Sequence, residues 1–257
     1  MERLCWGVLA TKADVAFYEY ANKIVAIPRT FITVISTVLF PRACQIVSQN
    51  NRHEMDKNCS VSLLINYFIG FASIFGLIGV GELFARIYFG EEFLICGDII
   101  AVMSPIILII GLGEIVRSLY IYPMKKDGAM VKILFVNAFV NIVLSAVLIP
   151  IIGVFGAVVG AVAAELIGLF AEVWICRKMI SVRMFIKDGI PFLVMGLIML
   201  ICIKMIGGFL PETAITLLIE VTSGATIYIG LAFVYCYCIR KDYKVYIEKV
   251  LHSFKSK

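Results

Sequence analysis

Polar and charged side chains interrupt one long apolar stretch, residues 15–42, and are the first candidates for chemistry. Asn22, Lys23 and Arg29 offer amide, ammonium and guanidinium donors, which are the groups that bind phosphate-like anions. Pro28 removes a backbone donor and is expected to kink or loosen a helix there. At about 100° per residue, five polar side chains share one narrow stripe of that helix: Tyr18, Asn22, Arg29, Thr33 and Ser36. We therefore expect a helix whose polar face is turned away from lipid.

Two charged residues, Arg29 and Glu165, are predicted to lie near the middle of a membrane. Each costs about 2.5 to 3.5 kcal/mol to insert, so each needs a partner or a water-filled cavity. One interpretation is a structural ion pair between them. The other is a cationic cavity in which Arg29 and Lys23 meet an anionic substrate while Glu165 orients or gates them. Lys23 could equally pair with Glu19, one turn back.

Amide side chains form a second set of candidates. Asn137 and Asn141 stand four residues apart, on one face of a helix, and could bind sugar hydroxyls or bridge two helices. Glu114 and Arg117 stand three apart, as in a local ion pair. The sequence contains no nucleophile motif, phosphate-binding loop or metal-ligand spacing. We therefore predict neither an enzyme nor a bound metal or cofactor.

The composition is that of an integral membrane protein. The 257 residues are 61% hydrophobic and 16% charged, and the mean hydropathy is +0.99. Apolar runs of about 20 residues predict membrane-spanning helices, whereas a barrel would show ten-residue alternation. The net charge of +5 could suggest a nucleic-acid partner. Because the basic residues fall in short loops and the tail, membrane topology explains them better and no nucleic-acid partner is predicted.

The fold class predicted is an all-α transmembrane bundle of about seven spans. Ser104–Pro105 should break the third span, and Gly156 with Gly160 should allow close helix packing in the fifth. We expect residues 1–14 to be an outer segment left from a missing helix. The spans are predicted at residues 15–42, 61–88, 98–121, 130–149, 154–176, 190–206 and 214–239.

The predicted orientation follows from the loop charges. Lys and Arg gather in alternate loops and in the tail, while the turn that contains Glu91 and Glu92 has no basic residue. The basic side should be cytoplasmic, which places the C-terminus inside. Residues 15–176 would then form a five-helix bundle. Residues 177–257 would form two accessory transmembrane helices and a basic cytoplasmic tail.

Several segments resemble one family of transporters. The run FYEYANKIVAIP through TVLFPR resembles the eighth-helix signature of Wzx-type polysaccharide flippases, in which an aromatic-Tyr-Glu pair, a Lys and a closing Pro-Arg recur. Similar matches join FGEEFLICGDIIAVMSPIILIIGLGEIVRSLYIYPMKKD to the tenth helix and its loop, and VNAFVNIVLSAVLIPIIGVFGAVVGAVAAELIG to the eleventh and twelfth. ERLCWGVLATKADV is similar to the end of the seventh. The resemblance covers residues 1 to about 180.

The resemblance implies a member of the multidrug/oligosaccharidyl-lipid/polysaccharide exporter superfamily, with fourteen helices in two lobes around a cavity. Such proteins move undecaprenyl-pyrophosphate-linked repeat units across the bacterial inner membrane for capsule, O-antigen or exopolysaccharide synthesis. This chain would be the C-terminal lobe with two accessory helices, and an N-terminal lobe would come from a missing or separate chain. The resemblance maps the cationic cavity residues to Arg29, Lys23 and Arg117, and the polar ones to Asn22, Asn137 and Asn141.

Three alternatives stay open. A multidrug or cation exporter of the same superfamily would favour acidic coupling residues over the Arg and Lys of the polar face. A membrane enzyme such as a polysaccharide polymerase would need a large outer loop, which the sequence does not provide. A non-functional fragment would have lost the first lobe altogether.

Overall fold

The computed structural model describes residues 12–49, 52–177, 179–180 and 182–239, and this part of the chain consists of helices joined by short turns. This confirms the predicted all-α class. The predicted tail after residue 239, and nearly all of the predicted segment 1–14, lie outside the described residues. The main helices are α2 (Lys12–Ser48), α3 (Arg52–Phe89), α4 (Ile95–Met103), α5 (Ile106–Val116), α6 (Asp127–Ile152), α7 (Val154–Cys176), α8 (Val182–Phe209) and α9 (Ala214–Val234).

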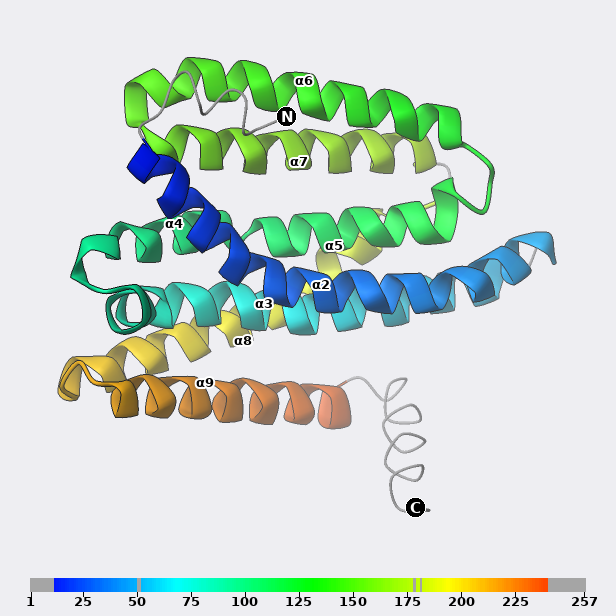
Figure 1. Ribbon diagram of the computed structural model, residues 1–257. Helices are drawn as coiled ribbons and strands as arrows, with labels where there is room; N and C mark the ends of the chain where they lie inside the picture. Colours follow the sequence, from blue (N-terminus) through cyan, green and yellow to red (C-terminus); the bar gives the residue numbers. More distant parts are fainter. Residues whose placement is uncertain (1–11, 50–51, 178, 181, 240–257) are drawn as a thin grey trace.

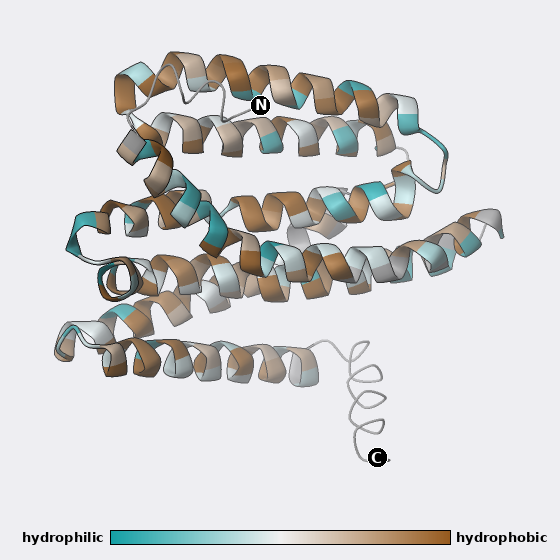
Figure 2. Cartoon of the chain, in the orientation of Figure 1, coloured by the Kyte–Doolittle hydropathy of each residue, from teal (hydrophilic) through white to brown (hydrophobic). Residues whose placement is uncertain are grey.

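The helices lie in layers with their long axes roughly aligned (Figure 1). The α6–α7 hairpin forms one side, α2 to α5 the middle and α8 with α9 the other side. Apolar residues dominate every layer (Figure 2). Six segments of the described chain are long and apolar enough to cross a membrane, so this is a multi-pass membrane protein: His53–Phe89, Glu91–Ile121, Asp127–Ile152, Val154–Cys176, Asp188–Phe209 and Ala214–Tyr237. Helix α2 is not among these six, and its role as the first span stays a prediction.

The polar face of α2 is turned inward, as the sequence predicts. Tyr18 and Ser36 are buried, at 7% and 4% exposure, whereas Phe31 on the other side is 64% exposed. Three threonine hydroxyls on α2 donate to the carbonyls one turn earlier, including Thr33 to Arg29 at 3.0 Å. These bonds occupy polar groups that would otherwise need water. Tyr18 and Ser36 of the polar stripe therefore face the bundle, whereas Thr30 and Thr37 outside it are exposed.

The third span is broken where proline predicts. Helix α4 ends at Met103, a turn at Ser104–Pro105 follows, and α5 begins at Ile106. Helix α5 then passes directly into a π-helical segment, η2 (Arg117–Ile121). π-helical turns are rare and often lie at functional sites. This one begins at Arg117 and sets the position of its side chain.

Helices α6 and α7 form a tight antiparallel hairpin. The chain reverses at Gly153, whose φ of 60° favours glycine. A Cβ on Gly156 would collide with the backbone of Leu148, so only glycine allows this approach. The predicted small-residue interface is thus confirmed. The hairpin holds Asn137 and Asn141 of α6 beside the acidic residues of α7.

Candidate functional site: a polar pocket among α2, α5, α6 and α7

A polar pocket of 810 Å³ lies among α2, α6, α7 and the α5–η2 segment. It brings together side chains more than 140 residues apart in the sequence. Five of the predicted site residues line it: Asn22, Arg117, Asn137, Asn141 and Glu165. Tyr18, Glu19 and Tyr122 add further polar groups to its wall. The sequence thus predicts much of this pocket's polar lining.

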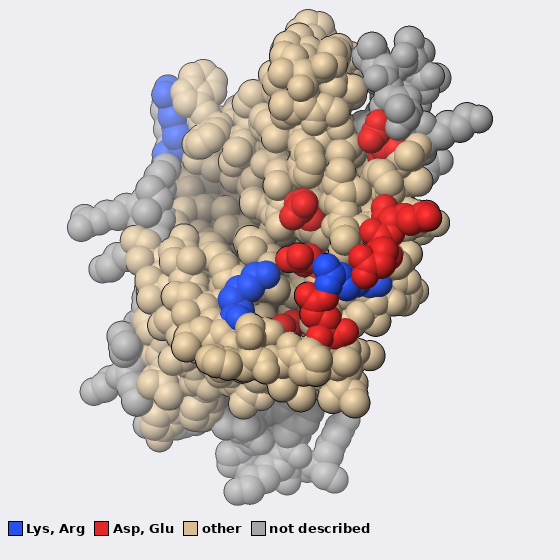
Figure 3. Space-filling view, turned by 90° about the vertical axis from the view of Figure 1, so that its left-hand side faces the viewer, with Lys and Arg blue, Asp and Glu red and all other residues tan. Residues whose placement is uncertain are grey.

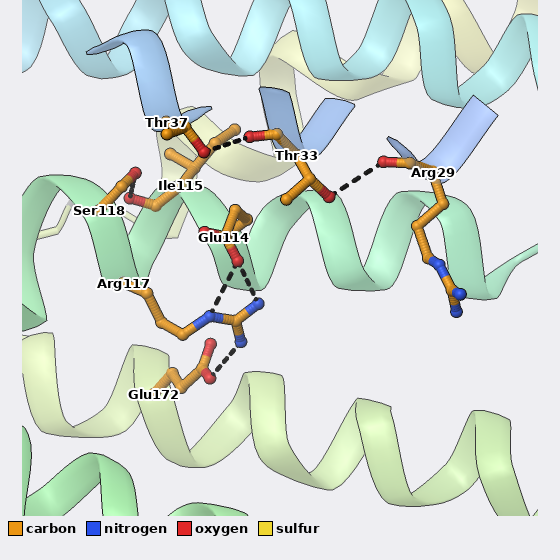
Figure 4. Close-up of polar contacts among 8 residues, drawn as sticks. All are labelled: Arg29, Thr33, Thr37, Glu114, Ile115, Arg117, Ser118 and Glu172. Atoms are coloured by element: carbon orange, nitrogen blue, oxygen red, sulfur yellow. Dashed lines mark hydrogen bonds and ion pairs between the residues drawn. The ribbon is translucent and has the colours of Figure 1, made fainter. Parts of the chain in front are cut away.

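Arg117 forms the centre of a charged cluster between α5 and α7 (Figure 4). Its Nη1 donates to Oε1 of Glu172 at 2.6 Å, and its Nη2 and Nε donate to Oε2 of Glu114 at 2.8 and 3.2 Å. The Glu172 side chain is only 1% exposed and that of Arg117 only 14%. Two carboxylates therefore neutralise this guanidinium, and it is held in place rather than free to follow a ligand.

Gly113 makes room for this cluster on α5. A Cβ at Gly113 would lie 2.9 Å from Oε2 of Glu172 and 3.0 Å from Nη1 of Arg117. Oε2 of Glu172 is buried and has no hydrogen-bond partner among the described residues. Acids therefore outnumber the base in this cluster, in a region shielded from water.

The two α6 amides occupy different environments. Oδ1 of Asn141 accepts a hydrogen bond from the Ser145 hydroxyl at 3.3 Å. Asn137 packs directly on Gly168 of α7. Its Oδ1 is buried without a hydrogen-bond partner among the described residues. Asn137 therefore keeps an unused acceptor at the edge of the pocket.

Lys23 and Arg29 of α2 do not line the pocket. Lys23 is exposed, and its Nζ lies 5.3 Å from the centre of the Tyr20 ring, in cation–π range. Arg29 is half-buried, and its side chain extends from α2 apart from the Arg117 cluster (Figure 4). No ion pair between described side chains joins Arg29 to Glu165. The structure thus separates the two residues that one interpretation of the sequence pairs.

Pro28 faces a different space. It lies inside α2 and borders an apolar groove of 430 Å³ that runs between α3, α8 and α9. The groove is lined almost wholly by aliphatic and aromatic side chains, together with Gly76, Gly224 and Ser73. Helix α2 therefore contributes to a polar pocket through Asn22 and to an apolar groove through Pro28.

Glu172 is a site residue that the sequence did not predict. Only Arg29 and Glu165 are predicted as charges deep in the bundle, yet Glu172 is the most buried carboxylate of the Arg117 cluster. A signal does exist, because Glu165 and Glu172 are seven residues apart and therefore share one face of α7. Its partner, 55 positions away, is visible only in the folded chain. Among the described residues, no group of three His, Cys, Asp or Glu side chains is arranged to hold a metal ion.

Known proteins resemble this chain in sequence and in fold. A family model for the lipid II flippase MurJ matches residues 5–237. A probable low-salt glycan biosynthesis flippase, Agl15 of Haloferax volcanii, is 22% identical over 178 residues, which are 69% of this chain and 37% of that relative. The solved structure of lipid II flippase MurJ in an inward closed conformation has a TM-score of 0.72 at 18% identity, covering 88% of this chain and 48% of that one.

The chain spans less than half the length of these two relatives. The structural likeness confirms the predicted fold, a helical bundle that matches about half of an exporter. The matching family is that of MurJ, within the superfamily predicted from the sequence, while the Wzx-type assignment stays a prediction. The family is one of flippases, which agrees with the prediction that the chain is not an enzyme.

Proposed function

Because the chain belongs to the lipid II flippase MurJ family, we propose that it is one lobe of a transporter that flips lipid-linked oligosaccharides. The substrate we propose is an undecaprenyl-pyrophosphate-linked repeat unit for capsule, O-antigen or exopolysaccharide synthesis in a bacterial inner membrane. The eighth-helix signature in residues 17–42 supports this substrate class. The name of the Haloferax relative, a glycan biosynthesis flippase, points the same way.

The observation that carries this proposal is the presence of Lys23 and Arg29 on α2. Arg29 is half-buried, and no described carboxylate pairs with its guanidinium, so its charge is available to an anion. We assign the pyrophosphate to Arg29 and Lys23, because a guanidinium and an ammonium are the strongest phosphate donors in the chain. Asn22, which precedes Lys23 directly and lies about two turns before Arg29 on the same helix, adds an amide donor.

The pocket would receive the sugars. The side-chain amides of Asn137 and Asn141 each contain a hydrogen-bond donor and an acceptor. They therefore suit sugar hydroxyls, which also donate and accept hydrogen bonds. Arg117, held by Glu114 and Glu172, would fix the shape of the pocket wall. Glu165 lines the same wall and would orient or gate the bound headgroup.

The hydrocarbon part of such a substrate needs an apolar path. The groove beside Pro28 offers one on the same lobe, because α2 borders both the groove and the pocket. We propose that Pro28 loosens α2 between the two spaces. A second lobe, from the same or a separate chain, would supply the opposite wall of the cavity. This arrangement allows alternating access by rocking of one lobe against the other.

A binding measurement tests the proposal. The purified chain in detergent is titrated with a short-chain polyprenyl-pyrophosphate disaccharide that carries a fluorophore. We expect Arg29→Ala and Lys23→Ala each to weaken binding about tenfold, the loss of one charge-assisted contact. Lys132→Ala, an exposed lysine on α6, is the matched control and should bind as the unaltered chain does. Equal binding by all four proteins would contradict the assignment.

Complementation tests the role of the second lobe. The chain is expressed in a flippase-null strain, alone and together with a first lobe. Surface polysaccharide should return only in the second case. When the chain is expressed together with the first lobe, Arg29→Ala should abolish surface polysaccharide while insertion into the membrane stays normal. If adding Glu165→Gln to Arg29→Ala restores transport, the two residues form a structural pair and the substrate role of Arg29 is wrong.

One observation favours a second candidate, a cation exporter of the same superfamily. Glu19 and Glu165 line the pocket, and Glu114 and Glu172 lie behind it, so carboxylates outnumber Arg117 there. A lipophilic cation such as ethidium discriminates between the two candidates. Ethidium binding that Glu165→Gln removes and Arg29→Ala leaves unchanged would support cation export. Binding of the pyrophosphate ligand that depends on Arg29 would support the flippase.

A further inference from the structure

A second polar pocket lies far from the first, at the end of the bundle where α8 turns into α9. It has a volume of 270 Å³ and is enclosed by α3, α8, α9 and the turn between α8 and α9. Acidic and basic side chains gather on this end of the bundle, which faces the viewer in Figure 3. The charged residues that line the pocket are Glu82, Arg86, Lys204, Glu212 and Glu220.

Glu220 is the most enclosed of these charges. It is only 5% exposed, and its Oε2 has no hydrogen-bond partner among the described residues. Its Oε1 packs against the backbone of Gly207, where any Cβ would collide with it. A carboxylate held in this way without a donor is costly near a membrane, so a ligand that donates hydrogen bonds would be bound tightly.

The remaining charges show what kind of ligand fits. The guanidinium of Arg86 is already paired with Glu212 and lies 3.8 Å from a carboxylate oxygen of Glu91. Lys204 and Glu82 are exposed at the pocket and enter no ion pair between described side chains. The pocket thus offers a buried carboxylate on α9 and an ammonium on α8. A ligand that carries both a cation and an anion is complementary to this pair.

The pocket also lies near the ends of two helices that are long and apolar enough to cross a membrane. Glu220 is the seventh residue of α9, so it lies about 9 Å along the helix from its first residue. Lys204 is five residues before the end of α8, at the same end of the bundle. Exposed apolar side chains lie within one helical turn of the lining residues Lys204 and Thr216: Ile201, Met205 and Ile215 are 59%, 60% and 70% exposed. These side chains provide a surface for acyl chains.

We propose that this pocket binds the headgroup of an aminophospholipid such as phosphatidylethanolamine. The primary ammonium donates hydrogen bonds to Glu220, and the phosphate accepts one from Lys204. The bound lipid fastens the α8–α9 hairpin to α3 and is distinct from the transported substrate. The site does not depend on the proposed function, because it shares no residue with the pocket around Arg117 or with the cations of α2.

Native mass spectrometry of the purified 257-residue chain tests the site. Phosphatidylethanolamine, phosphatidylcholine and phosphatidylglycerol with the same acyl chains are each added to the protein in detergent. We expect the chain to retain phosphatidylethanolamine about tenfold better than the other two, because one has no N–H donor and the other no amine. Retention of all three to the same extent would show unspecific surface lipid and overturn the proposal.

Matched variants locate the binding. Glu220→Gln should remove the preference for phosphatidylethanolamine, whereas Glu92→Gln, an exposed carboxylate outside the pocket, should keep it. Gly207→Ala should crowd Glu220 and weaken retention, while Gly230→Ala, outside the pocket and with nothing within 4 Å of its Cβ, should not. Lys204→Ala should weaken phosphatidylethanolamine and phosphatidylcholine alike, because both carry the phosphate. If Glu220→Gln does not fold, Lys204→Ala decides, and unchanged retention by that variant would overturn the proposal.

Discussion

Nη1 of Arg117 lies 2.6 Å from Oε1 of Glu172, and this hydrogen bond joins α7 to the start of the η2 segment across the interior of the lobe. Glu114 holds the other edge of the same guanidinium. The arrangement fixes the guanidinium in the wall of the polar pocket and leaves one carboxylate oxygen of Glu172 without a partner among the described residues. The pocket is therefore built on an internal charge cluster that the lobe itself supplies.

Loss of the guanidinium should destabilise the lobe strongly. Arg117→Ala leaves Glu114 and Glu172 facing each other without a cation, which costs about 3 to 5 kcal/mol for a buried pair. We expect a clear fall in the apparent unfolding temperature of the detergent-purified chain. Arg117→Met combined with Glu172→Leu should recover part of the loss, because the Glu172 side chain, only 1% exposed, then no longer carries a charge without a counterpart, whereas Glu114, 22% exposed, still lacks its partner. Equal losses in the single and double variants would contradict a pairing role.

A methyl group at Gly113 should disturb the same cluster from the backbone. Gly113→Ala places a Cβ 2.9 Å from Glu172 and 3.0 Å from Arg117, so the ion pair must move. We expect a loss of about 1 to 3 kcal/mol, as for other overpacked sites. Gly230→Ala on α9 is the control, because its Cβ meets nothing within 4 Å. That variant should be as stable as the unaltered chain or slightly more, since alanine favours helix.

The unused acceptor of Asn137 should matter for binding and not for folding. Because its buried Oδ1 has no partner among the described residues, Asn137→Ala removes an unsatisfied group and should leave the unfolding temperature unchanged or raise it. Binding of the pyrophosphate disaccharide should fall about threefold to tenfold, the loss of one neutral hydrogen bond. Asn58→Ala on α3, also buried but outside the pocket, should not change binding. A fall in stability without a change in affinity would make Asn137 structural.

Cysteine labelling tests the predicted orientation. In a variant without the native cysteines, Glu92→Cys and Gly128→Cys place one exposed thiol at each end of the bundle. Lys125 and Lys126 adjoin Gly128, so the distribution of basic residues predicts that this end is cytoplasmic. A membrane-impermeant maleimide should label the cysteine at 92 in intact cells. It should label the cysteine at 128 only after the membrane is opened, and the reverse pattern would invert the topology.

The sequence alone determined the fold class and the positions of most helices along the chain. Runs of apolar residues and their breaks are local properties, so the predicted fifth span, 154–176, coincides with α7, and the break at Ser104–Pro105 lies where α4 gives way to α5. The inward stripe of α2 is equally local, because it follows from helical periodicity. Five of the proposed site residues also line one pocket, since each is a polar group that a membrane helix must turn inward.

Only the tertiary structure decided which charges meet. Arg117 pairs with Glu172 rather than with Glu114 alone, and Arg29 and Glu165 form no ion pair among the described side chains. Helical periodicity gives the face on which a side chain lies, but it does not give the rotation and depth at which two helices pack. Those depend on close contacts such as Gly113 against Glu172, made between residues far apart in the chain. Ion pairs in the bundle therefore depend on the packing of all its helices.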